Sequence, residues 1–163
     1  MAALPIAVKD VSRFEQNLDR AVEEVFSTMM GVSCAPAEGG AGSGSEHGTI
    51  SAVVGLAGAI SGSLVLHSGS DAAMRIAERM MGVAPEGVDA MVRDAMGEVC
   101  NMVAGAWKGA DPELTSACLL STPTVVAGSS YELFSQRAPI RIERGYQFED
   151  GVLSITLFCE CGK

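Results

Sequence analysis

The stretch VDAMVRDAMGEVCNMVAGAWKG, residues 88–109, decides how the chain folds. Apolar side chains recur in it at helical spacing, at Val88, Val92, Ala95, Val99, Met102 and Ala106. At 100° per residue these positions share one side of a helix, and we expect that side to face a core. Pro85 and Gly87 precede the stretch and Gly109 closes it, as helix-breaking residues do. The stretch therefore predicts a long amphipathic helix.

The opposite side of this helix is polar in an unusual way. It carries Asp94, Glu98, Asn101, Gly105 and Lys108, at steps of four, three, four and three. Asn and Gly are poor helix formers, so they are unusual choices for a merely solvated surface. The Asn101 amide can both donate and accept a hydrogen bond, which orienting a water molecule requires. Gly105 leaves the next turn without a side chain, so another backbone can come close. An ordinary solvated face is the simpler interpretation. The stripe alone does not decide between a solvated face and a site that orients a water molecule.

Two further helices and several strands are expected around this segment. Periodicity predicts helices over residues 11–31 and 68–82, the latter with Ser68 or Ser70 as N-cap, Asp71 in its first turn and Gly82 as C-cap. Apolar or alternating runs predict strands over residues 49–56, 59–67, 114–121 and 138–147. Ala57-Gly58 suits the first hairpin turn, and Pro123 ends the third of these strands or bends the chain after it.

The end of the chain predicts one more strand after a turn at Asp150-Gly151. Leu153, Ile155, Leu157, Cys159 and Cys161 would share one face of it. Residues 36–48, PAEGGAGSGSEHG, predict a flexible loop. The order of elements predicts one α+β domain over residues 1–163: long helices on a mostly antiparallel sheet, with a hint of two similar helix–hairpin–helix halves.

Composition narrows the functional classes. The 163 residues include 11 Lys and Arg against 20 Asp and Glu, a formal net charge of −9. We therefore expect no nucleic-acid or anionic-membrane partner. No secretory signal or membrane span is evident, and the five cysteines are an odd number, so we expect a reduced, cytoplasmic protein.

The cysteines raise a metal or redox alternative. Cys159-x-Cys161 could be half of a zinc site, but His47 and His67, the two histidines, show no ligand spacing to it. Core thiols are the better interpretation, and we expect no metal ligand set and no cofactor bound by the chain. Cys100 has no paired base nearby in sequence, which argues against a nucleophilic cysteine.

The polar stripe and a distant proline together resemble a known signature. Asp94-x3-Glu98-x2-Asn101-x21-Pro123 resembles the D/S-x3-E-x2-N-x21-P signature of the CheC, CheX and FliY phosphatases. The flanking strings GEVCNMVAG (97–105) and LLSTPTVVAG (119–128) are also similar to that family. In the first helix, Asp10-x3-Phe14-x2-Asn17 lacks the glutamate. A single site resembles the CheX branch.

The resemblance implies a phosphatase that acts on the aspartyl phosphate of a CheY-like receiver domain, in chemotaxis or another two-component pathway. It implies that Asn101 holds the attacking water and that Glu98 pairs with a cation of the receiver. Asp94 and Gly105 would orient or dock the partner, and Pro123 would shape the adjoining loop. Mg²⁺ would come with the receiver, and the family often forms homodimers. The alternative is a non-catalytic module that binds a receiver or a flagellar-switch component.

Overall fold

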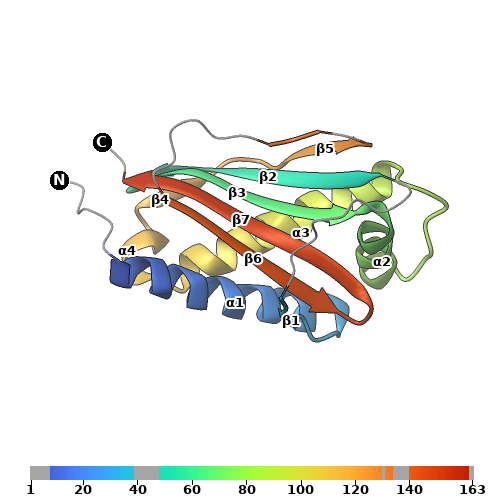
Figure 1. The fold of residues 1–163 in the computed structure, drawn as a ribbon, viewed down its shortest axis with the longest axis horizontal. Helices are drawn as coiled ribbons and strands as arrows, with labels where there is room; N and C mark the ends of the chain where they lie inside the picture. Colours follow the sequence, from blue (N-terminus) through green and yellow to red (C-terminus); the bar gives the residue numbers. More distant parts are fainter. Residues whose placement is uncertain (1–7, 39–47, 130, 134–139, 162–163) are drawn as a thin grey trace.

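Figure 1 shows a computed structural model of the chain, which describes residues 8–38, 48–129, 131–133 and 140–161. Its helices are α1 (Val8–Met30), α2 (Ser70–Met81), α3 (Ala90–Gly109) and the short α4 (Pro112–Thr115). Its strands are β1 (Ala35–Pro36), β2 (Thr49–Gly58), β3 (Ile60–Gly69), β4 (Cys118–Leu120), β5 (Thr124–Gly128), β6 (Ile140–Phe148) and β7 (Gly151–Cys161).

The strands form one sheet in the order β1-β6-β7-β3-β2-β4, and β5 pairs with the other end of β2. Every strand pair is antiparallel. Helices α1 and α3 pack against each other and against the sheet (Figure 1). Helix α1 contacts β6 and β1, and α3 contacts β2 and β3. The predicted α+β class, long helices on a mostly antiparallel sheet, is confirmed.

Strand alternation places the core between this sheet and the helices. In β7, Leu153, Ile155, Leu157 and Cys159 are buried, as the alternation predicts, and the Cys161 side chain lies outside the described residues. In β2, Ile50, Ala52 and Val54 are buried on the same face. The hairpin expected at Asp150-Gly151 forms, but its turn lies one residue earlier: Phe148 pairs with Gly151, so Glu149 and Asp150 are the turn residues and β7 begins at Gly151.

Helix α3 contributes more of its circumference to the core than the sequence suggests. Val92, Ala95 and Val99 are buried as predicted, whereas Val88, Met102 and Ala106 are only partly buried. A neighbouring set of positions is also fully buried: Met96, Cys100, Val103, Ala104 and Trp107. The reason is that α3 packs on the sheet along one side and on α1 and α2 along the other. The exposed polar face is correspondingly narrow.

Several element boundaries differ from the predictions. The N-cap of α2 is Gly69, so neither Ser68 nor Ser70 caps it, while Gly82 closes it in the left-handed conformation as expected. The N-cap of α3 is Asp89, whose carboxylate accepts from Val92 N at 3.0 Å. Strand β2 continues through Gly58, which the hairpin holds at φ 110° with its backbone against Ala117 O. Only a residue without Cβ fits that approach.

The strand predicted over residues 114–121 is mostly wrong. Residues 112–115 form α4, because Asp111 accepts from Glu113 N at 2.9 Å and Pro112 suits the first helical position. A strand is present only at Cys118–Leu120. The sequence also gave no sign of β5 after Pro123 or of β1, whose two residues add to the edge of β6. Residues 39–47 of the predicted loop lie outside the described residues.

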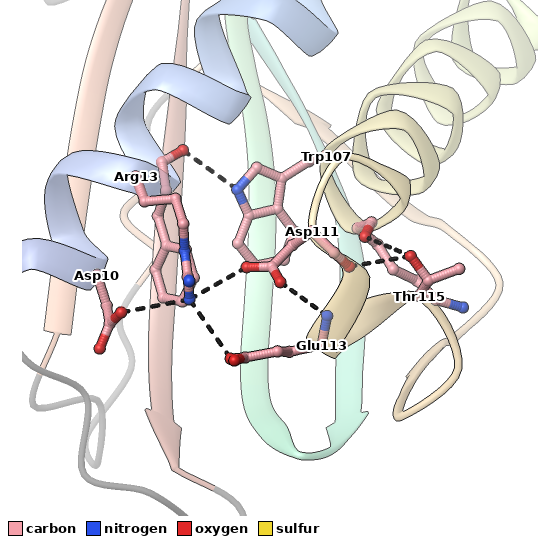
Figure 2. A network of polar contacts seen from close by, with 8 residues as sticks. Asp10, Arg13, Trp107, Asp111, Glu113 and Thr115 are labelled. Carbon is pink, nitrogen blue, oxygen red and sulfur yellow. Dashed lines mark hydrogen bonds and ion pairs between the residues drawn. The ribbon is translucent and has the colours of Figure 1, made fainter.

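A polar network fastens α3 to the start of α1 (Figure 2). The indole of Trp107 donates to Phe14 O at 3.2 Å, and the two rings meet edge to face at 5.4 Å. The guanidinium of Arg13 lies 3.3 Å from a carboxylate oxygen of Asp10 and 3.2 Å from one of Asp111, which is only 2% exposed. Because these contacts fix the end of α3 on α1, they hold the rest of α3 in a defined orientation.

Candidate active site

The five polar positions predicted on one side of α3 lie together on its surface, and we call them the α3 ridge: Asp94, Glu98, Asn101, Gly105 and Lys108. Asp94 and Glu98 are exposed, and the other three are half-buried. Within the described residues, none of the four side chains in the ridge makes a hydrogen bond or an ion pair with another group. The ridge therefore presents polar groups at the surface that no described residue engages.

Asn101 and Glu98 lie three residues apart, so their side chains are neighbours on the helix surface. The Asn101 carboxamide keeps its two donor hydrogens and its acceptor oxygen for a ligand or water. Gly105 lies one turn further along, and a Cβ added there would meet no atom within 4 Å. The helix surface one turn after Asn101 is therefore open.

Pro123 touches α3 at a glycine that the sequence analysis did not single out. A Cβ built on Gly97 would lie 3.4 Å from Pro123 Cγ and 3.4 Å from Val125 Cγ2. Gly97 precedes Asn101 by one turn, so the chain after β4 crosses α3 directly beside the ridge. A Cβ at Gly97 would make ordinary van der Waals contact with Pro123, so the proline packs directly on this turn of the helix. A glycine inside a strongly helical segment is the signal that could have revealed this contact.

The corresponding positions of α1 are not available for a second site. Phe14 is buried against Trp107, and Asn17 is only 6% exposed. Both face the packed interior beneath the sheet. The structure thus gives α1 a packing role where α3 has an exposed ridge.

The cysteines occupy core positions. Cys34, Cys100, Cys118 and Cys159 are buried. The Cys100 thiol donates to Ala52 O at 3.4 Å, and burial raises its pKa to about 12. A thiolate nucleophile at neutral pH is therefore strongly disfavoured there. No group of three His, Cys, Asp or Glu residues in the described ranges is placed to hold a metal ion.

His67 lies on the face of the sheet opposite Cys159, in a cluster of its own. Its Nδ1 is 2.7 Å from Ser51 Oγ, which is also 2.9 Å from the Tyr131 hydroxyl. Tyr131 donates to Val126 O at 3.3 Å. Burial lowers the pKa of His67, and the nearby Glu143 carboxylate partly opposes that effect. This cluster ties the chain after β5 to β2 and β3.

One known protein family matches more than half of this chain. The family model described as "Chemotaxis phosphatase CheX" matches residues 50–143, which is 94 of the 163 residues and includes all of α3 and Pro123. The chain belongs to the CheX family. A comparison with curated proteins finds no match.

Solved structures of CheX and FliY proteins share this fold. The chemotaxis protein CheX of Vibrio vulnificus aligns with a TM-score of 0.77 at 24% identity, over 92% of this chain and 98% of that one. CheX of Borrelia burgdorferi, solved in complex with CheY, BeF3 and Mg²⁺, aligns with a TM-score of 0.70 at 17% identity, over 90% and 97%. FliY of Thermotoga maritima aligns with a TM-score of 0.68 at 17% identity, over 97% and 92%. These likenesses show the CheC/CheX/FliY fold.

Among the described residues of this chain, no helix is long and apolar enough to cross a bilayer.

Proposed function

We propose that this CheX-family protein hydrolyses the aspartyl phosphate of a CheY-like receiver domain. The observation that carries the proposal is the Asn101 carboxamide, unengaged within the described residues and presented beside Glu98 on an open ridge. Family membership and the existence of a CheX–CheY complex in Borrelia burgdorferi support the choice of partner.

The chemistry asks little of the phosphatase beyond positioning. An aspartyl phosphate is an activated acyl phosphate, and the receiver brings the Mg²⁺ that neutralises its oxygens. Asn101 enters the receiver's site and holds a water in line with the phosphorus, its oxygen accepting from the water. Holding the nucleophile in an attack geometry removes much of the entropic barrier. Water then attacks phosphorus, the bond to the aspartyl oxygen breaks, and inorganic phosphate leaves.

Glu98 acts by docking rather than by touching the phosphoryl group, because two negative charges repel. Its carboxylate binds a cation of the receiver and fixes the register of the complex. Asp94, one turn earlier, supports the same orientation. Gly105 leaves room for the receiver's backbone, and Pro123 shapes the chain that borders the ridge at Gly97. Two expectations stay predictions: the cytoplasmic location, expected from the cysteines and the absence of an evident secretory signal or membrane span, and the homodimer, expected from the resemblance.

The test measures phosphate release from a receiver charged with a small phosphodonor. Wild type accelerates release over the receiver's own rate, and Asn101→Ala loses on the order of 10²-fold or more of that acceleration, as for removal of one preorganised polar group. Asn101→Asp keeps the shape but adds a negative charge, and loses at least as much. Gln16→Ala removes an exposed amide from α1 and is the matched control, with wild-type activity expected.

An unchanged rate in Asn101→Ala contradicts the water-positioning role. The non-catalytic alternative predicts a different pattern: wild type binds the receiver loaded with fluoroberyllate but does not accelerate phosphate release. Glu98→Ala separates docking from chemistry, because we expect a higher KM with kcat nearly unchanged. A normal KM in Glu98→Ala would exclude its docking role.

A further inference from the structure

Lys108 is the one member of the α3 ridge to which neither the family signature nor the mechanism assigns a task. It follows Asn101 by seven residues, so it lies two helical turns away on the same side, about 10 Å along the axis. Its side chain is half-buried and has no carboxylate within ion-pair distance among the described residues.

The surroundings of Lys108 explain why its charge stays uncompensated. The residues four before and four after it, Ala104 in α3 and Pro112 at the start of α4, carry no charge. Asp111 is the nearest acidic residue in sequence, but its two carboxylate oxygens face Arg13 and Glu113 N (Figure 2). The Lys108 ammonium is therefore available to a partner.

Charge is segregated along the α3 ridge. Both carboxylates, Asp94 and Glu98, lie on the N-terminal side of Asn101, and Lys108 lies on the C-terminal side. Asn101 and Gly105, between them, carry no charge. A partner with a basic group facing the two carboxylates and an acidic group facing Lys108 meets opposite charges at both ends of the ridge. The same partner turned end to end meets like charges at both ends, so one direction of docking is favoured.

A structural explanation competes with a docking one. A lysine in the last turn of a helix interacts favourably with the helix macrodipole, which contributes to stability and not to binding. If this were the only role of Lys108, reversing its charge would leave the KM for the receiver unchanged. The two explanations therefore predict different measurements.

We propose that Lys108 is a docking residue that binds a carboxylate on the receiver surface, and that Lys108 and Glu98 together fix the direction in which the receiver lies along α3. The inference rests on the proposed function for its partner. It specifies that partner's surface: a basic group opposite Glu98 and an acidic group opposite Lys108, about 15 Å apart. Lys108 acts on docking and does not touch the reacting atoms.

The test compares steady-state phosphate release for wild type, Lys108→Arg, Lys108→Glu and Arg20→Glu. Arg20 is exposed on α1 and has no ion pair among the described residues, so its reversal makes the same change in net charge away from the ridge. We expect Lys108→Glu to raise KM about tenfold with kcat within about twofold, and the difference to shrink as salt is raised. Lys108→Arg keeps KM near wild type, and Arg20→Glu leaves it unchanged.

The direct readout is the Kd for the receiver loaded with fluoroberyllate and Mg²⁺. If wild type releases phosphate but Lys108→Glu has the KM and Kd of Arg20→Glu, the docking role is wrong and the proposed function stands. If wild type binds the loaded receiver without accelerating phosphate release, and Lys108→Glu weakens that binding, the proposed catalysis is wrong and the docking role stands. If wild type does not bind the receiver, both are wrong.

Discussion

Replacing Gly105 by Ala is expected to stabilise the fold and to weaken docking at the same time. Gly105 lies within α3, four residues before its last residue, where glycine is a poor helix former. A Cβ added there meets no atom within 4 Å, so the substitution brings no steric penalty inside the protein. The helix gains about 0.5–1 kcal/mol from the lower backbone entropy of the unfolded chain.

The same methyl group projects into the space that the receiver is proposed to occupy. Over-packing a close contact by one carbon typically costs about 1–2 kcal/mol, which raises KM roughly 5- to 30-fold. The predicted signature is therefore a variant that is more stable and less active. Gly109→Ala is the matched control, because Gly109 is exposed on the same helix and a Cβ there is also unopposed.

Two assays check the two halves of this prediction. Urea unfolding of Gly105→Ala should show a higher midpoint with an unchanged slope, and the melting temperature should rise by about 1–4 °C for a chain of this size. Phosphate release, measured over a range of receiver concentrations, should show the higher KM. Wild-type kinetics in a stabilised Gly105→Ala would refute the reasoning about docking, and a loss of stability would refute the reasoning about the open helix surface.

Two other perturbations test the framework that holds the site. Arg13→Gln should destabilise the protein by about 1–3 kcal/mol in chemical denaturation, because it leaves a buried oxygen of Asp111 without its cation, and Asp111→Asn should cost less. Burial lowers the pKa of His67 in the folded protein, so the unfolded chain binds that proton more tightly. The free energy of unfolding should therefore fall as pH drops below about 6.5. In His67→Gln the free energy of unfolding should change less with pH in that range. If wild type and His67→Gln show parallel curves of unfolding free energy against pH, His67 is not the titrating group.

Local sequence patterns predicted the long elements well. Helix α3 and strand β7 have periodic apolar positions, and the structure buries Val92, Val99, Leu153 and Leu157 accordingly. The predictions failed where short local signals compete. In residues 112–115 the apolar Leu114 suggested a strand, but the capping carboxylate of Asp111 and the following proline start a helix instead.

The candidate site divides in the same way. The spacing of the site residues along α3 follows from helix geometry, so the α3 ridge (Asp94, Glu98, Asn101, Gly105 and Lys108) could be predicted without coordinates. The contact between Pro123 and Gly97 could not, because it depends on how the chain after β4 crosses α3.

The amino-acid sequence by itself determined which residues share a side of α3, because a helix fixes that through 3.6 residues per turn. Only the tertiary structure decided how much of the circumference of each helix is buried. Helix α1 turns Phe14 and Asn17 into the interior, whereas α3 packs through Cys100, Val103 and Trp107 and leaves Asn101 on the surface. The physical reason is that burial depends on what packs against a helix from distant parts of the chain, and no local pattern encodes that.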